Sequence, residues 1–124
     1  MNRRILVADD NRANLDLMLY LLRAFEYEAE GVSDGLVALA VAQSGTFALV
    51  LTDILMPGID GYELLRRVRA DERLASTPLV AVTALAMPTD VERIADAGFD
   101  GYITKPIEPQ TFVSQVAAFL RPYA

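Results

Sequence analysis

The feature that most restricts the fold of this chain is a fivefold alternation of short apolar runs with stretches of helically spaced apolar residues. The apolar runs occupy residues 4–8, 28–32, 47–52, 78–83 and 101–104. Their length and composition predict strands, and the second, more polar run is predicted to lie at an edge of the sheet. A stretch of apolar residues at helical spacing follows each run, in residues 15–22, 37–42, 64–68, 91–95 and 112–120. The alternation predicts an α/β fold with a doubly wound, five-stranded parallel sheet and helices on both faces.

Local signals predict where the helices begin. In chain order they are the turn and cap residues Asp9-Asp10-Asn11, the segment Ser33-Asp34-Gly35, a capping box of Asp60 and Glu63, the pair Thr89-Asp90, and Pro109. Each offers an oxygen for the free N–H groups of a first helical turn, or a proline at a position that needs no N–H.

Polar residues come directly after the apolar strands. Asp9 and Asp10 end the first, Asp53 the third, Thr83 the fourth and Lys105 the last. Right-handed crossovers bring all the carboxyl ends of parallel strands to one edge of the sheet, and ligands bind there, where the strand order reverses. We therefore expect these five residues to form one site. Asp53 in particular needs a polar environment, because a carboxylate inside an apolar strand is costly unless it is paired or bound to a metal.

Composition excludes several classes of function. The 124 residues, 53% of them hydrophobic and 23% charged, predict one globular domain spanning residues 1–124. No cysteine and no histidine are present, which excludes thiolate or imidazole metal sites and a Ser-His-Asp triad. A net charge of −6 disfavours nucleic acid as a partner. No apolar run is long enough to span a membrane, so we expect a cytoplasmic protein with no membrane contact.

The remaining chemistry is that of carboxylates, a hydroxyl and an ammonium group. Clustered carboxylates repel one another unless a cation joins them, and Mg²⁺ prefers oxygen ligands. A lysine and a threonine at the same edge suit a phosphoryl group, as a point charge and a hydrogen-bond donor. A carboxylate nucleophile, Asp53, beside Mg²⁺ and Lys105 is a suitable arrangement for phosphoryl transfer to aspartate.

These residues resemble those of the receiver domain of two-component response regulators, over essentially the whole chain. The matching motifs are Asp9-Asp10, Asp53 within Asp-Ile-Leu-Met-Pro-Gly-Ile-Asp-Gly, Thr83-Ala84 and Lys105-Pro106. The resemblance implies a flavodoxin-like sheet of order 2-1-3-4-5 with Asp53 as the phosphoacceptor. It also implies Mg²⁺ held by Asp10, Asp53 and the main-chain carbonyl of Leu55, and by Asp9 largely through water. Lys105 would pair with the phosphoryl group, before a cis bond to Pro106, while Thr83 and Tyr102 match the family's switch.

The resemblance also implies partners. The phosphodonor would be a histidine kinase or a histidine phosphotransfer protein, docking near the first helix, where Leu15 and Met18 are expected to be partly exposed. Because the chain ends at Ala124, we expect a single-domain regulator, a monomer or weak dimer, that signals through contacts with a downstream protein. Its output surface would be the last two helices and the strand between them. Such a protein is a phosphoacceptor that loses its own phosphate, not a turnover enzyme.

Two other functions compete with this interpretation. A phosphatase of the haloacid dehalogenase type also uses an aspartyl phosphate, but Leu55 stands where that family has its second aspartate. A phosphorylation-independent adaptor would not need the complete acidic set with Lys105. Structural interpretations also compete for single residues: Asp9-Asp10 as a helix cap, Thr83 and Tyr102 as ordinary strand residues, and Lys105 as a solvated turn residue. The arginines from Arg66 to Arg73 alternate with acids and are interpreted as a solvated helix face.

Two leucines lead to a prediction about the lifetime of the phosphorylated state. By resemblance, the side chains two places after the acceptor and two after the switch hydroxyl border the path of the hydrolytic water. Here these residues are Leu55 and Leu85. Neither can hydrogen-bond a water molecule, so we expect them to act as a gate that makes the phosphoaspartate long-lived.

Overall fold

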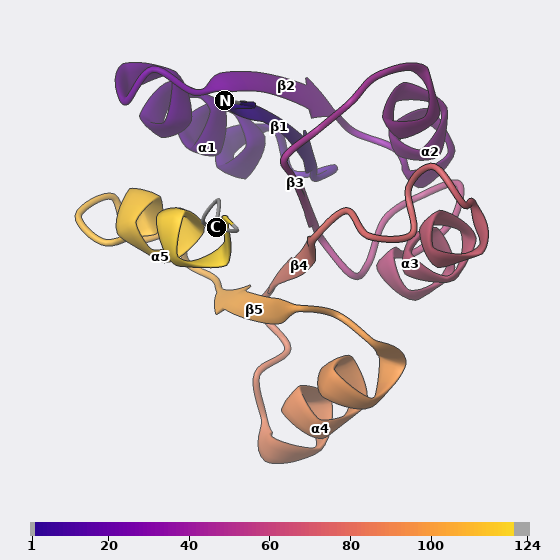
Figure 1. Ribbon diagram of the computed structural model, residues 1–124. Coiled ribbons are helices and arrows are strands. Elements are labelled where there is room, and N and C mark those ends of the chain that lie inside the picture. Colours follow the sequence, from indigo (N-terminus) through magenta and orange to yellow (C-terminus); the bar gives the residue numbers. More distant parts are fainter. Residues whose placement is uncertain (1, 121–124) are drawn as a thin grey trace.

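The structure, a computed structural model, describes residues 2–120 and confirms the predicted alternation (Figure 1). Its elements are β1 (Arg4–Ala8), α1 (Arg12–Ala24), β2 (Glu28–Val32), α2 (Gly35–Ser44), β3 (Leu49–Thr52), α3 (Gly61–Ala70), β4 (Leu79–Thr83), α4 (Pro88–Ala97), β5 (Gly101–Thr104) and α5 (Phe112–Phe119). The strands form one sheet of order β2-β1-β3-β4-β5. Every neighbouring pair is parallel, so all five carboxyl ends lie at the same edge.

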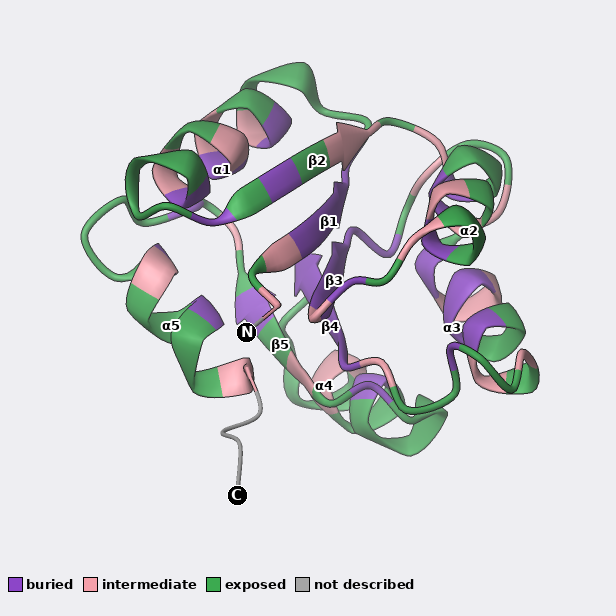
Figure 2. Cartoon of the chain, turned by 45° about the horizontal axis from the view of Figure 1, so that its top comes forward, coloured by how far each residue is buried: buried purple, intermediate pink, exposed green. Residues whose placement is uncertain are grey.

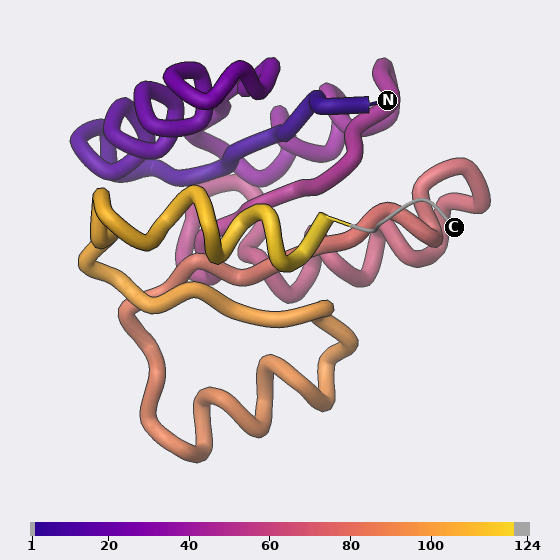
Figure 3. Tube along the Cα trace, turned by 60° about the vertical axis from the view of Figure 1, so that its left-hand side comes forward, coloured from indigo at the N-terminus to yellow at the C-terminus, as the bar shows by residue number. Residues whose placement is uncertain are grey.

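Helices cover both faces of the sheet. On one face, Ile5 and Val7 of β1 pack with the buried residues of α1 and α5, and these two helices lie side by side (Figures 1 and 3). On the other face, Leu6 and Ala8 pack with α2, α3 and α4. This division follows from the strand itself, because successive side chains of a strand point to opposite faces. Figure 2 shows the result as a buried sheet between helices whose outer surfaces are exposed.

The three central strands β1, β3 and β4 are buried almost throughout, whereas β2 and β5 alternate between buried and exposed residues. The predicted edge position of β2 is therefore confirmed. On α1, the guanidinium group of Arg23 donates hydrogen bonds to Ala29 O of β2, at 2.8 and 3.2 Å. This contact satisfies a main-chain acceptor on the free side of β2, an edge strand.

Several boundaries differ from the prediction. The third strand begins at Leu49 rather than at 47, and the fourth at Leu79 rather than at 78. Helix α4 begins at Pro88, before the predicted Thr89-Asp90 cap, because the Asp90 side chain accepts a hydrogen bond from Met87 N and closes the first turn earlier. Helix α5 begins at Phe112, because the residues after Pro109 form a separate turn in which Phe112 N donates to Glu108 O.

The expectation that Leu15 and Met18 are partly exposed on α1 is wrong. Both side chains are buried, at 4% and 0% exposure, because they are the residues with which α1 packs on the sheet. The large apolar side chains that are exposed at this helix are Tyr20 and Phe25, at 71% and 58%.

Helix α2 packs on the sheet through the small residues Ala38 and Ala42. Within residues 2–120, no helix has the length and apolar character needed to cross a membrane.

Candidate functional site

Three carboxylates meet at the carboxyl edge of the sheet, as predicted. Asp9 and Asp10 follow β1, Asp53 follows β3, and one oxygen of each lies within 4.8 Å of the others. Asp9 is completely buried, Asp53 is 9% exposed, and Asp10 is exposed. The group therefore opens to solvent at one end and is enclosed by protein at the other.

Main-chain hydrogen bonds fix the two buried acids. Asp53 N donates to Ala8 O at 2.9 Å, which continues the pairing of β3 with β1 by one residue beyond the strand. Ile54 N then donates to Asp53 Oδ1 at 2.8 Å. Asp9 is held in the same way, since Asn11 N donates to its Oδ1 at 2.8 Å. Each carboxylate thus has one oxygen held by the backbone and a second, Oδ2, directed elsewhere.

Lys105 joins the two buried acids. Its Nζ lies 2.8 Å from Asp53 Oδ2, where it donates a hydrogen bond, and 2.9 Å from Asp9 Oδ2. Lys105 therefore pairs with the Oδ2 atoms of both buried acids. Lys105 is 13% exposed at its side chain, and it is the only lysine in the chain. Its peptide bond to Pro106 is cis, as the resemblance implied.

The electrostatics follow from burial and from these pairings. Burial raises the pKa of Asp9 above its ordinary 3.8, and the opposing contacts with Lys105 and Asn11 only partly offset it. Burial on its own lowers the pKa of Lys105, but its contacts with Asp53 and Asp9 outweigh this effect and leave the pKa raised. The ammonium group therefore stays charged at neutral pH, and a further cation near Asp9 would favour the ionised acid.

A glycine allows the backbone to approach Asp53 closely. Gly61 begins α3, and its N–H donates to Ile54 O at 2.7 Å. A Cβ atom at this position would lie 2.6 Å from Asp53 O, which is too close for any other residue. Asp60 caps the helix by accepting from Glu63 N at 2.9 Å. The predicted capping box is only half formed in the described residues, because the Glu63 carboxylate accepts from Arg66 and Arg67 instead.

Thr83 and Tyr102 lie on the neighbouring strands β4 and β5. Thr83 is buried at the end of β4, and its Oγ1 accepts a hydrogen bond from Leu85 N at 3.0 Å. Thr83 O accepts from Lys105 N at 2.9 Å, which joins the loops that follow β4 and β5. Tyr102 is 39% exposed on β5. The Thr83 hydroxyl group can still donate a hydrogen bond, since the bond from Leu85 N occupies only a lone pair of Oγ1.

Leu55 and Leu85 are large apolar residues at the same edge that are exposed, at 64% and 40%. Leu55 lies in the loop between Asp53 and Gly61, and Leu85 in the loop after Thr83. Gly58, in the first of these loops, has a φ of +83°, which a residue with a side chain rarely adopts. The site thus has a charged interior and two exposed leucines in the loops that leave it.

The residues present fit a divalent cation such as Mg²⁺. The donor set contains only oxygens, from three carboxylates that share one lysine. Such a cluster favours a further cation, because one ammonium group does not offset the mutual repulsion of three carboxylates. Oxygen ligands and an opening to solvent at Asp10 are what Mg²⁺ requires, since this ion usually keeps several waters.

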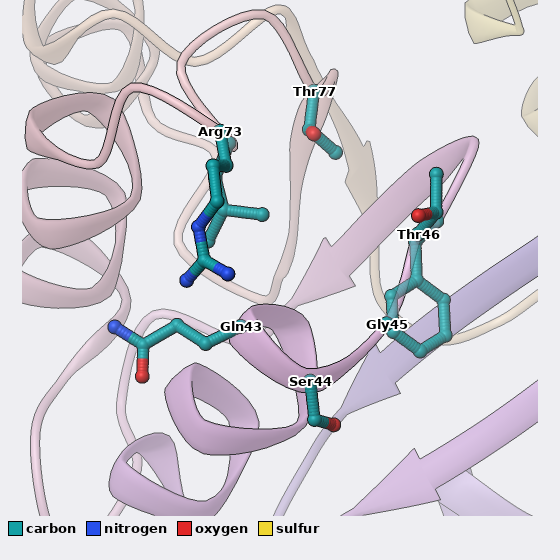
Figure 4. A pocket seen from close by; sticks show the side chains of 8 residues that line it. Gln43, Ser44, Gly45, Thr46, Arg73 and Thr77 are labelled. Atoms are coloured by element: carbon teal, nitrogen blue, oxygen red, sulfur yellow. The ribbon is translucent and has the colours of Figure 1, made fainter.

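A separate hollow lies away from these acids, between the end of α2 and the connection from α3 to β4 (Figure 4). It has a volume of about 260 Å³. Its lining residues are Gln43, Ser44, Gly45, Thr46, Phe47, Arg73, Leu74 and Thr77. Arg73 extends toward Gln43 in this view. None of the residues predicted for the site lines it.

A parallel sheet of order 2-1-3-4-5 with three acids and a lysine at its carboxyl edge defines a CheY-like signalling domain. The family model of the response regulator receiver domain matches residues 5–117, and the chain belongs to this family. Polar-differentiation response regulator DivK of Brucella ovis is 36% identical over 120 residues, which cover 97% of this chain and 98% of DivK. The phosphoacceptor role in two-component signalling is the function of the family and of this domain.

Solved structures of response regulators and receiver domains have the same fold as this chain. Chemotaxis response regulator CheY4 of Vibrio cholerae matches with a TM-score of 0.91 at 28% identity, over 97% of this chain and 100% of that one. The receiver domain of sensor histidine kinase PA1611 of Pseudomonas aeruginosa matches with a TM-score of 0.87 at 29% identity, over 97% and 98% of the two chains. That structure has a magnesium ion coordinated in its active-site cleft. Receiver domains take phosphoryl groups from histidine kinases and signal to downstream targets, and they are not turnover enzymes of the usual kind.

Proposed function

We propose that Asp53 is the phosphoacceptor and takes its phosphoryl group from a phosphohistidine of a histidine kinase or histidine phosphotransfer protein. The observation that carries this assignment is the position of Asp53 Oδ2, 2.8 Å from Lys105 Nζ and beside Asp9 and Asp10. A nucleophilic carboxylate at the end of the central strand therefore has a cation next to the oxygen that faces the site. Asp9 is too enclosed to meet a donor protein, and Asp10 has no bond to Lys105 among the described contacts.

The transfer itself is a substitution at phosphorus. An Asp53 oxygen forms a new bond to phosphorus while the bond from phosphorus to the donor's imidazole nitrogen breaks, and the electron pair of that bond leaves with the nitrogen. The reaction needs alignment and neutralisation of charge more than acid–base catalysis. Ile54 N holds Asp53 Oδ1 and thus orients the carboxylate, and Lys105 provides positive charge for the incoming phosphoryl oxygens.

Asp10, Asp53 and the main-chain carbonyl of Leu55 would hold Mg²⁺, with Asp9 acting largely through water. When bound, the ion neutralises charge on the acids and on the phosphoryl oxygens. The clustering of three carboxylates around one lysine supports this assignment.

Thr83 and Tyr102 would convert phosphorylation into a change of surface. The Thr83 hydroxyl can donate its proton to a phosphoryl oxygen at the same edge, while its oxygen accepts the present bond from Leu85 N. Phosphorylation adds about −1.5 to −2 charges, which favours the conformation in which the hydroxyl turns inward. The output surface would consist of α4, β5 and α5, with Tyr102 exposed on its central strand.

The remaining expectations for this protein stay predictions. The protein would be a cytoplasmic monomer or weak dimer that acts through a downstream protein, and it would lose its phosphate by slow hydrolysis in place. Because Leu15 and Met18 are buried, a donor that docks near α1 would contact exposed residues such as Tyr20 instead. Leu55 and Leu85 would form the gate against water.

Incubation with acetyl phosphate, followed by intact mass, tests the proposal. The protein should gain one phosphoryl group in the presence of Mg²⁺ and none when the ion is removed by a chelator. Lys105→Met should slow the gain, because the charge next to Asp53 Oδ2 is lost. A gain that is equally fast without Mg²⁺ and in Lys105→Met would contradict the proposed roles of both cations.

A further inference from the structure

The connection from β2 to α2 contributes no side chain to the acidic site, yet it is bonded to two of the segments that form it. At the end of β2, Val32 O accepts a hydrogen bond from Asp9 N at 3.0 Å. Three residues later, Gly35 N donates to Pro57 O at 3.1 Å. Pro57 lies in the loop that connects Asp53 to α3, the phosphoacceptor loop (residues 54–60). The backbone of this connection therefore reaches both the Asp9 segment and the phosphoacceptor loop.

The fit between α2 and this loop is close. A Cβ atom on Gly35 would lie 2.0 Å from Ile59 O, so only glycine permits the observed approach. Gly58 lies against Asp34 in the same way, since a Cβ atom on Gly58 would lie 2.8 Å from Asp34 Oδ1. Two glycines, one on each partner, thus permit the approach: Gly35 meets the backbone of Ile59, which cannot adjust by a change of rotamer, and Gly58 meets the Asp34 carboxylate.

Asp34 has two roles in this contact. Its Oδ1 accepts hydrogen bonds from Leu36 N and Val37 N, at 2.7 and 3.1 Å, and so caps α2. The same carboxylate packs against Gly58, whose φ of +83° sets the course of the loop. The cap therefore fixes the first turn of α2 and, through Gly58, the loop three residues beyond Leu55.

We infer that Asp34 and Gly35 are positioning residues for the metal and phosphoryl site, acting through the phosphoacceptor loop. This inference rests on the proposed function, in which the main-chain carbonyl of Leu55 is a metal ligand. A carbonyl in a loop has no side-chain torsion by which to reach the ion, so its position depends on what holds the loop. The bond from Gly61 N to Ile54 O joins the two ends of the loop, and Asp34 and Gly35 hold it in the middle.

The test uses Gly35→Ala and Asp34→Ala with two comparison variants. Asp34→Asn keeps an acceptor oxygen for the cap and should resemble the wild type. Asp71→Ala is the matched control, because Asp71 Oδ1 also accepts a main-chain hydrogen bond, from Arg73 N at 3.0 Å, in the connection from α3 to β4. Mg²⁺ affinity is measured by calorimetric titration, and metal-free stability by urea unfolding.

Gly35→Ala and Asp34→Ala should weaken Mg²⁺ binding by about tenfold or more, the usual effect of losing a group that orients a metal ligand. Asp71→Ala should lower stability without changing Mg²⁺ affinity. If both Asp34→Ala and Gly35→Ala bind Mg²⁺ within about twofold of the wild type, the inference is overturned. Should Gly35→Ala fail to fold, the comparison of Asp34→Ala with Asp34→Asn decides.

Amide hydrogen exchange separates this inference from the proposed function. In metal-free protein, the Gly61 amide should exchange faster in Asp34→Ala than in the wild type, relative to amides of β4, because the loop that carries its acceptor is released. This comparison needs no Mg²⁺ and no phosphate. Unchanged exchange at Gly61 counts against the positioning role, while a wild type that binds no Mg²⁺ counts against the proposed function alone.

Discussion

Lys105 Nζ lies 2.8 Å from Asp53 Oδ2, although the two residues are 52 positions apart in the sequence. Both side chains are largely buried, at 13% and 12% exposure, and the same ammonium group contacts Asp9. Before any metal or phosphate binds, the only lysine of the chain is therefore the counter-charge of the two enclosed acids. This arrangement stabilises the site and also prepares it for a group with negative charge.

Lys105→Met should leave two buried carboxylates without their cation. We expect the free energy of unfolding at neutral pH to fall by about 2–3 kcal/mol, since a buried charge that loses its partner is costly. Urea unfolding without Mg²⁺ measures this change. The control is Arg12→Met, which breaks the exposed pair of Arg12 with Asp16 and should change stability by less than about 0.5 kcal/mol. Equal effects of the two substitutions would argue against a special pairing at Lys105.

Asp10→Ala should separate the stability of the acidic cluster from its metal binding. Without Mg²⁺ the variant should melt at a higher temperature than the wild type, because one of three mutually repelling carboxylates is gone. Added Mg²⁺ should stabilise the wild type but not the variant. Asp96→Ala, an exposed acid on α4, serves as the control and should keep the response to Mg²⁺. A full response in Asp10→Ala would remove Asp10 from the ligand set.

The gate of Leu55 and Leu85 predicts the lifetime of the phosphoaspartate. Leu55→Asn and Leu85→Glu each introduce a group that can orient a water molecule by one hydrogen bond, worth about 1–3 kcal/mol in the transition state. The Mg²⁺-dependent loss of phosphate should therefore accelerate by roughly 5- to 150-fold. Tyr20→Asn, at an exposed aromatic residue of α1, should leave the decay unchanged. If decay stays the same in both leucine variants, water exclusion does not set the lifetime.

Glu63 predicts a pH dependence of stability that is independent of the site. Hydrogen bonds from Arg66 and Arg67 lower the pKa of Glu63 from 4.5 to about 2. Because this pKa is lower in the folded state, ionised Glu63 contributes fully to the stability of the fold above pH 4.5. This contribution is lost as the pH falls through about 2. The stability difference between wild type and Glu63→Gln should therefore shrink over this range in urea unfolding, and salt should reduce it at pH 6. A difference that does not vary with pH would rule out the charged pairing as its cause.

The sequence was sufficient to predict the sheet and the convergence of the site. Asp9, Asp10, Asp53, Thr83 and Lys105 each follow an apolar run, and the rule that parallel strands end at one edge brings them together. The distances could not be predicted in the same way. Lys105 contacts both Asp53 and Asp9 because of the path of the loop after β5. Hydrophobic periodicity gives no information about that path.

Burial on helices was harder to predict. The buried stripe of α1 includes Leu15 and Met18, and helical spacing alone identifies an apolar face without showing whether a partner covers it completely. The contact of Asp34 and Gly35 with the phosphoacceptor loop was missed for another reason. A cap followed by glycine is an ordinary start of a helix, and the close approach of Ile59 O comes from a segment more than twenty residues away. Only the arrangement of α2 beside that loop gives the glycine its role.

The central claim is that Asp53 is the single residue that accepts the phosphoryl group. Intact mass after incubation with Mg²⁺ and acetyl phosphate tests it most directly, with wild type, Asp53→Asn and Asp60→Asn compared in parallel. Asp60 lies in the same motif but caps α3, so Asp60→Asn should still be labelled, because asparagine also caps a helix. The account predicts a gain of one phosphoryl group in wild type and in Asp60→Asn, and none in Asp53→Asn. Stoichiometric labelling of Asp53→Asn would contradict it.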